Sequence, residues 1–185
     1  MAVIYFISGK ARHGKDTVGL YLKEFYEMDN KKVITCAYAN YLKEYAKKIS
    51  DWDGNEDTKP RGLLQKLGSV IREELNLGDM LTDRLNYDIL IYSKFADVII
   101  VTDVRLKKEI EAIKRNFPNA ISINVNRINF DNGLTLEQKN NITEMERRLP
   151  SGKRLSFILT HSFSSEKRMM PFLFFSFNRS CHFFS

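Results

Sequence analysis

The sequence has few cysteines and no long apolar run. Its two cysteines, Cys36 and Cys181, lie far apart among 185 residues and form no recognisable motif. This usage favours a reducing compartment and gives no sign of a thiolate metal site. The apolar run at residues 3–7 is too short for a signal peptide or a membrane span. We therefore expect a cytoplasmic protein with no membrane partner.

Acidic residues are scarce in the last part of the chain. Residues 145–185 contain seven lysines or arginines but only two glutamates, so they hold five of the six net positive charges. The rest of the chain is almost neutral, which weakens the case for a nucleic-acid surface. We expect no nucleic-acid partner. A basic nucleic-acid-binding protein stays open as an alternative, and its binding should then depend on residues 145–185.

The same segment differs in composition from everything before it. Residues 145–185 hold eight of the thirteen phenylalanines and eight serines. No sustained helix or strand period is visible there. Two explanations stay open, an unusual tail or loss of the native reading frame near residue 145, and the abrupt change in composition favours the second. Sequencing the encoding DNA would distinguish them.

A phosphate-binding pattern lies near the start of the chain. Gly9 is followed, after four residues, by Gly14 and Lys15, between an apolar run and a helical pattern. This is the spacing and setting of a P-loop, whose glycines let backbone N–H groups and a helix N-terminus point at phosphate. Lys15 would reach the β- and γ-phosphates. The residues expected to bind the nucleotide are Gly9, Lys10, Ala11, Arg12, His13, Gly14, Lys15, Asp16 and Thr17.

Three loop residues have open roles. Asp16 occupies the position at which a P-loop usually has Ser or Thr as a Mg²⁺ ligand, so it either binds the metal or stabilises the helix start. Arg12 either contacts phosphate or is solvated. His13 is expected to be an exposed loop residue rather than a catalyst.

Strand and helix patterns alternate from residue 3 to residue 125, which predicts an α/β fold with a parallel sheet. Strands are expected at residues 3–8, 32–37, 98–101 and 120–125. The first helix should bury Val18, Tyr21, Leu22, Phe25 and Met28, and the second Leu42, Tyr45, Ala46 and Ile49. The acidic stretch at residues 51–58 is expected to be a solvated turn.

A basic stripe and two strand ends complete the candidate site. Arg61, Gln65, Gly68 and Arg72 fall in one narrow sector of a predicted helix. They suit an anionic ligand, or form a plain surface stripe, and Gly68 suggests that some group approaches closely. Asp103 follows a buried strand and is either a metal ligand or a helix cap. Arg127 follows the next strand.

These motifs resemble one family. Residues Gly9 to Thr17 resemble the P-loop of deoxynucleoside monophosphate kinases of tailed phages and their prophage relatives. Arg61-x3-Gln65-x2-Gly68-x3-Arg72 resembles their monophosphate-binding helix, and Asp103-Val-Arg105-x3-Glu109 their third motif. The resemblance covers about residues 3–144. Animal phosphomevalonate kinases are similar in the P-loop and near Asp103, so an isoprenoid acceptor stays open, as does a nucleotide-binding protein without kinase activity.

The resemblance implies a three-layer α/β/α P-loop kinase domain at residues 1–144, with an incomplete C-terminal part and the atypical segment 145–185 after it. It implies transfer of phosphate from ATP to a nucleoside monophosphate, with a homodimer as one option. The catalytic residues would be Lys15, Arg105 and Asp103. The monophosphate would bind Arg61, Gln65, Arg72 and Arg127, and Mg²⁺ would bind Asp16 and Asp103.

Three side chains near these motifs have two interpretations each. Tyr38 and Tyr41 either stack on the acceptor base or are core aromatics. Glu109 lies four residues after Arg105, so an ion pair along the helix is its simplest role.

Overall fold

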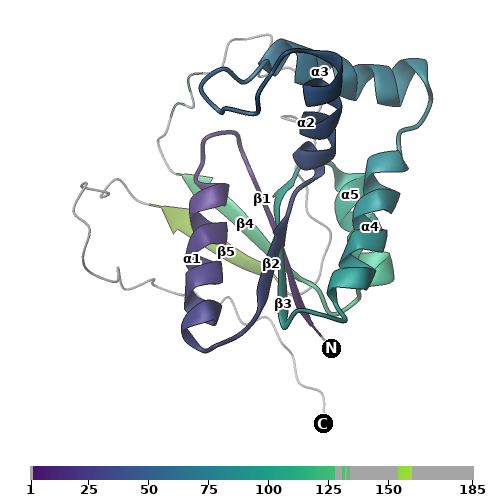
Figure 1. Ribbon diagram of the computed structural model, residues 1–185. Coiled ribbons are helices and arrows are strands. Elements are labelled where there is room, and N and C mark those ends of the chain that lie inside the picture. Colours follow the sequence, from purple (N-terminus) through teal and green to yellow (C-terminus); the bar gives the residue numbers. More distant parts are fainter. Residues whose placement is uncertain (1, 128–130, 132, 134–153, 160–185) are drawn as a thin grey trace.

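The computed structural model describes residues 2–127, 131, 133 and 154–159, and Figure 1 shows how strands and helices alternate along this part. The elements are β1 (Val3–Gly9), α1 (Lys15–Met28), β2 (Val33–Cys36), α2 (Tyr38–Ile49), α3 (Arg61–Ser69), a π-helical turn η1 (Val70–Glu74), α4 (Met80–Tyr92), β3 (Val98–Val104), α5 (Lys107–Asn116), β4 (Ile121–Arg127) and β5 (Arg154–Leu159).

The strands form one sheet in the order β2-β3-β1-β4-β5, and every pair of neighbours is parallel. β1 lies at the centre, and its apolar run pairs with β3 on one side and β4 on the other. A parallel strand in this position is buried on both faces, which explains its continuous apolar sequence. Because all strands are parallel, their carboxyl ends meet at one edge, and the loop after β1 lies at that edge (Figure 1).

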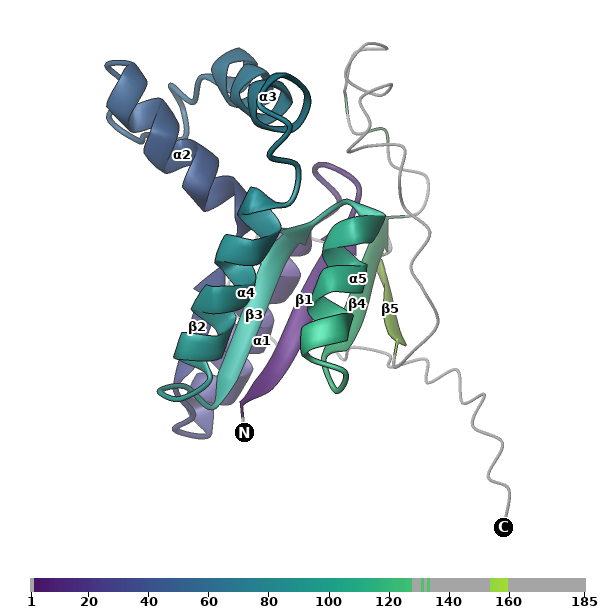
Figure 2. The ribbon, with the colours of Figure 1, turned by 90° about the vertical axis from the view of Figure 1, so that its right-hand side faces the viewer.

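Helices cover the two faces of the sheet (Figures 1 and 2). On one face, Val18 and Leu22 of α1 pack against Ile7, Ile100 and Val125. The opposite face is covered by α4 and α5, and the side chains that pack there include Phe6, Leu85, Ile89, Ile99, Ile110 and Ile113. The structure therefore confirms an α/β fold with a parallel sheet between two helical layers.

The buried faces of α1 and α2 differ from the prediction. In α1, Tyr21 is 37% exposed, Phe25 60% and Met28 70%, whereas Tyr26 packs against the core. In α2, Ile49 is 60% exposed. The predicted stripes were too wide, because one helix lying on a sheet buries only the sector that touches it, and apolar residues in the neighbouring sector stay outside.

The strand β5 was not predicted. Residues Arg154–Leu159 pair in parallel with β4, from Ser122 to Arg127. A six-residue strand is too short to give a clear period when the residues around it have no pattern. The sheet thus extends into the segment that the sequence set apart, and the other residues of that segment lie outside the described part. No helix within the described residues is long and apolar enough to span a membrane.

Candidate functional site

The loop between β1 and α1 has the backbone of an anion-binding loop. Gly9 has φ +149°, Arg12 φ +62° and Gly14 φ +92°, so three of its residues adopt positive φ values. Gly14 is the N-cap of α1, which begins at Lys15. The first N–H groups of a helix have no partner within it. The loop therefore presents backbone donors at the carboxyl edge of the sheet, where an anion would also meet the positive end of the α1 dipole.

Position 9 requires glycine for two reasons, its backbone angle and the closeness of a neighbouring strand. A Cβ at Gly9 would lie 2.3 Å from the backbone oxygen of Val125 in β4. That distance is impossible without moving the strand or the loop. The sharp turn out of β1 therefore depends on a residue without a side chain.

Lys15 lies folded across the loop. Its side chain is buried, with an exposed fraction of 7%, and Nζ donates a hydrogen bond to the backbone oxygen of Lys10 at 2.9 Å. This bond holds the ammonium group inside the curve of the loop. A phosphate bound by the loop backbone would meet a positive charge that is already in position.

His13 is buried, so the expectation of an exposed residue was wrong. Its exposed fraction is 3%, and its Nδ1 accepts a hydrogen bond from the backbone N–H of Arg127 at 3.0 Å. The sequence could not show this contact because the partner lies 114 residues away. His13 thus ties the loop to the end of β4, and Arg127 approaches the loop through its backbone.

Asp16 and Arg12 both reach the surface of the site. Asp16 and Thr17 are exposed in the first turn of α1, and the Asp16 carboxylate makes no hydrogen bond with the described residues. Arg12 is also exposed, and a Cβ at Gly133 would lie 3.0 Å from its Nη1. No group of three or more His, Cys, Asp or Glu side chains suited to a metal ion occurs among the residues described.

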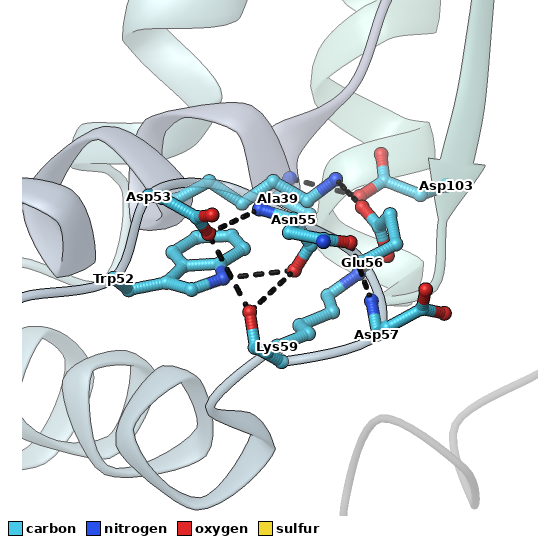
Figure 3. Close-up of polar contacts among 10 residues, drawn as sticks. Ala39, Trp52, Asp53, Asn55, Glu56, Asp57, Lys59 and Asp103 are labelled. Atoms are coloured by element: carbon cyan, nitrogen blue, oxygen red, sulfur yellow. Dashed lines mark hydrogen bonds and ion pairs between the residues drawn. The ribbon is translucent and has the colours of Figure 1, made fainter.

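Asp103 holds the start of α2. Its Oδ1 accepts from the N–H of Tyr38 at 2.8 Å and its Oδ2 accepts from the N–H of Ala39 at 2.9 Å. Figure 3 shows the carboxylate beside the backbone of Ala39. Asp103 therefore caps a helix, but a helix that comes earlier in the chain rather than the one that follows it. Each oxygen keeps a second lone pair.

Glu109 binds backbone rather than pairing with the guanidinium of Arg105, which corrects the simple ion-pair expectation. Its Oε2 accepts from the N–H groups of Arg105 and Leu106, both at 2.8 Å. Burial raises the pKa of this carboxyl to about 7, although these two hydrogen bonds oppose the shift. The turn from β3 into α5, which carries Arg105, is therefore fixed by a partly buried carboxyl group.

The four residues of the predicted basic stripe lie on α3 and η1. Arg61 and Gln65 are exposed, and Arg72 is partly buried. A Cβ at Gly68 would lie 3.1 Å from Nη1 of Arg72, so the group that approaches Gly68 closely is the guanidinium of Arg72. The π-helical turn, which the sequence did not predict, does not separate the two residues. The guanidinium groups of Arg61, Arg72 and Arg105 make no ion pair with any described residue.

The acidic side chains of residues 51–58 are exposed, as expected for a solvated turn, but internal contacts also hold this loop between α2 and α3. Trp52 is buried and its Nε1 donates to the backbone oxygen of Asn55 at 2.9 Å. Glu56 accepts from Lys43 at 2.6 Å and Lys59 at 2.8 Å, which lower its pKa to about 2. Figure 3 shows Trp52, Glu56 and Lys59 together. The alternating Asp and Asn residues, typical of Asx turns, were the signal in the sequence.

Tyr38 and Tyr41 are core aromatics, as one of their two interpretations predicted. Both have an exposed fraction of 5%. The Tyr41 hydroxyl donates to Asp88, and the Arg84 guanidinium lies over the Tyr41 ring, 4.3 Å from its centroid. Burial raises the pKa of both hydroxyls. Neither ring is exposed for stacking on a base.

No family model and no curated protein matches this chain. The assignment of the site therefore depends on its geometry. That geometry brings together, at one edge of the sheet, the glycine-containing loop from Gly9 to Gly14, a buried lysine and the ends of β3 and β4, with α2 and α3 beyond the same edge (Figures 1 and 2).

Proposed function

We propose that this chain transfers the γ-phosphoryl group of ATP to a nucleoside 5′-monophosphate, on a P-loop kinase fold of the nucleoside-monophosphate-kinase type. The observation that carries the proposal is the loop from Gly9 to Lys15, with its positive backbone angles and its buried lysine. The arginines of α3 and η1, which make no ion pair with the described residues, supply a second anion site.

The donor triphosphate would bind the loop. The N–H groups at the start of α1 would hold its phosphates, and Lys15 would exchange its bond to Lys10 for one to a β- or γ-phosphate oxygen. Arg12, on the outside of the loop, would contact the same phosphates. This arrangement neutralises negative charge without any covalent bond to the protein.

The residues at the loop also suit a magnesium ion. Asp16 is exposed in the first turn of α1 and makes no hydrogen bond with the described residues. A hard carboxylate oxygen at this point, with phosphate oxygens and waters, is a reasonable ligand set for Mg²⁺. When bound, the ion would withdraw charge from the phosphates. Asp103 would contribute only its remaining lone pairs, because both of its oxygens already hold α2.

The acceptor monophosphate would bind Arg61 and Arg72. A guanidinium group matches a phosphate with two parallel hydrogen bonds, and two such groups compensate a dianion. Gln65, on α3, lies between them in the sequence and offers both a donor and an acceptor to the sugar or base. A side chain at Gly68 would displace the guanidinium of Arg72 by a few tenths of an ångström.

The reaction needs alignment more than acid–base chemistry. An oxygen of the acceptor phosphate would bond to the γ-phosphorus while the bond from that phosphorus to the bridging oxygen breaks and ADP leaves. The acceptor phosphate is largely a dianion at neutral pH, so no base has to remove a proton. Arg105 and Arg127, at the ends of β3 and β4, would stabilise charge on the transferred group.

The proposal is tested by incubating the full chain with ATP, Mg²⁺ and a panel of ribo- and deoxynucleoside monophosphates, with phosphomevalonate as a non-nucleotide acceptor. We expect diphosphate from particular nucleotides only. Arg72→Met should raise the KM for that acceptor, whereas Arg115→Met, at an exposed arginine of α5, should leave it unchanged. If phosphomevalonate is phosphorylated and no nucleotide is, the acceptor is an isoprenoid phosphate rather than a nucleoside monophosphate.

A further inference from the structure

The helices that carry the acceptor arginines stand beyond the edge of the sheet and rest on α2. Arg61 and Arg72 lie on α3 and η1, and α3 packs mainly on α2 and on η1 itself. Figure 2 shows α2 and α3 together beyond the edge at which the loop after β1 lies. We call residues 50–77, between α2 and α4, the outer arm. The place of the outer arm relative to the loop from Gly9 to Lys15 therefore depends on how α2 is held.

Two pairs of side chains join α2 to α4. The hydroxyl of Tyr41 donates a hydrogen bond to Oδ2 of Asp88 at 2.5 Å. One turn further along α2, the carboxylate of Glu44 accepts a hydrogen bond from Arg84 at 3.2 Å. The guanidinium of Arg84 also lies over the ring of Tyr41, 4.3 Å from its centroid. The four side chains thus form one connected cluster, which we call the α2–α4 clasp.

The bond between Tyr41 and Asp88 is the stronger part of the clasp. Tyr41 is 5% exposed and Asp88 is partly buried, and a hydrogen bond to a carboxylate is stronger than one between neutral groups. The side chains of Arg84 and Glu44 are 43% and 57% exposed, and an ion pair in contact with water contributes little. The position of α2 against α4 therefore depends mainly on the carboxylate of Asp88.

We propose that Asp88 is a positioning residue for the anion site of Arg61 and Arg72. It holds α2 through the hydroxyl of Tyr41, and α2 in turn carries the outer arm. Asp103 holds the first residues of α2 from β3, so the two carboxylates fix neighbouring turns of α2, one from the sheet and one from α4. This inference rests on the proposed function, because it treats Arg61 and Arg72 as the site of the acceptor monophosphate.

A second tyrosine hydroxyl provides a matched control. Tyr5 of β1 is 8% exposed, and its hydroxyl oxygen lies 2.6 Å from that of Tyr26 on α1. This hydrogen bond joins the sheet to α1, which does not carry the outer arm. Tyr5→Phe and Tyr41→Phe each remove one hydroxyl and keep the aromatic ring. Both should lower the thermal stability of the chain, whereas only Tyr41→Phe should disturb the outer arm.

Steady-state kinetics of the full chain with ATP and a nucleoside monophosphate test the role in acceptor binding. Tyr41→Phe and Asp88→Ala should each raise the KM for the acceptor by roughly three- to tenfold and leave the KM for ATP unchanged. The double variant should be no worse than either single variant, because both changes remove the same bond. Asp88→Asn keeps an acceptor oxygen and should recover part of the loss. Tyr5→Phe should leave both KM values unchanged.

Hydrogen–deuterium exchange without any substrate tests the hold on the outer arm separately. Backbone amides of α3 and η1 should exchange faster in Tyr41→Phe than in the wild type, and at the wild-type rate in Tyr5→Phe. Unchanged exchange in Tyr41→Phe would overturn the proposal. So would an acceptor KM that stays unchanged in Tyr41→Phe, or that rises equally in Tyr5→Phe. A wild-type chain that phosphorylates no acceptor would refute the proposed function instead, and the exchange rates would then decide by themselves whether the clasp holds the outer arm.

Discussion

The backbone N–H of Arg127 donates a hydrogen bond to Nδ1 of His13, with 3.0 Å between the two nitrogens. This contact joins the end of β4 to the loop after β1. The imidazole must carry its proton on Nε2 for Nδ1 to accept. The end of β4 thus holds the loop, so the shape of the loop does not depend on a bound phosphate alone.

Removing the His13 side chain should loosen the loop. We expect His13→Ala to lower the free energy of unfolding by about 1 to 3 kcal/mol, because the partly buried N–H of Arg127 loses its acceptor. It should also raise the KM for ATP. His13→Asn offers an acceptor oxygen at a similar position. It should therefore retain more of the stability and more of the affinity for ATP than His13→Ala. Urea unfolding and ATP titration measure the two effects, and equal losses in the two variants would argue against a role for this hydrogen bond.

Two glycines form a matched pair of substitutions. Gly9→Ala places a Cβ 2.3 Å from the oxygen of Val125, whereas Gly62→Ala, in α3, meets nothing within 4 Å. We expect Gly9→Ala to lose nucleotide binding and stability. Gly62→Ala should stabilise the protein by up to about 1 kcal/mol through helix propensity. Thermal unfolding with and without ATP tests both, and tolerance of alanine at Gly9 would contradict the structure of the loop.

Loss of the contact between Asp103 and α2 should affect binding of the acceptor but not binding of the nucleotide. Asp103→Ala removes both acceptors for the N–H groups of Tyr38 and Ala39. Because α2 leads through the Trp52 loop to α3, we expect a higher KM for the acceptor, together with a loss of roughly 1 to 3 kcal/mol in stability. Nucleotide affinity measured without Mg²⁺ should change little. A large loss of that affinity would show that Asp103 acts on the donor phosphates instead.

Glu109 should make stability depend on pH. Its pKa is raised from 4.5 to about 7, so the folded state holds this proton more tightly than the unfolded chain. The free energy of unfolding contributed by Glu109 is therefore greatest below pH 4.5 and falls as the pH rises towards 7, by about 3 kcal/mol in all. Above pH 7 the effect is constant.

Glu109→Gln isolates this contribution. Glutamine cannot ionise, and its side-chain oxygen can still accept from the N–H groups of Arg105 and Leu106. The difference in unfolding free energy between the variant and the wild type should therefore shift in favour of the variant between pH 5 and pH 8. Urea titrations at several pH values measure it. Parallel pH profiles for the two proteins would disprove the raised pKa.

Patterns that repeat locally predicted much of the fold. The apolar runs of β1 and β3 indicated buried parallel strands, and the spacing of Gly9, Gly14 and Lys15 located the loop between β1 and α1. These features depend only on residues close together in the sequence. The close approach of a group to Gly68 was predicted for the same reason, since Arg72 lies only about one helical turn away.

Contacts between distant segments could not be predicted. Nothing near His13 shows that the end of β4 will cover it, and nothing near Asp103 shows that its partners lie in α2, 64 and 65 residues earlier. The exposure of Phe25 likewise depends on which sector of α1 contacts the sheet. In each case the deciding partner is fixed by the packing of the whole domain rather than by local periodicity.

The measurement that tests the central claim most directly is ADP formation from ATP with and without a nucleoside monophosphate, for the wild-type chain and for Lys15→Ala. The account predicts ADP in equal amount to nucleoside diphosphate, only when the acceptor is present, with a loss of at least about a hundredfold in the variant. Tight ATP binding without acceptor-dependent turnover, or turnover unchanged in Lys15→Ala, would contradict it.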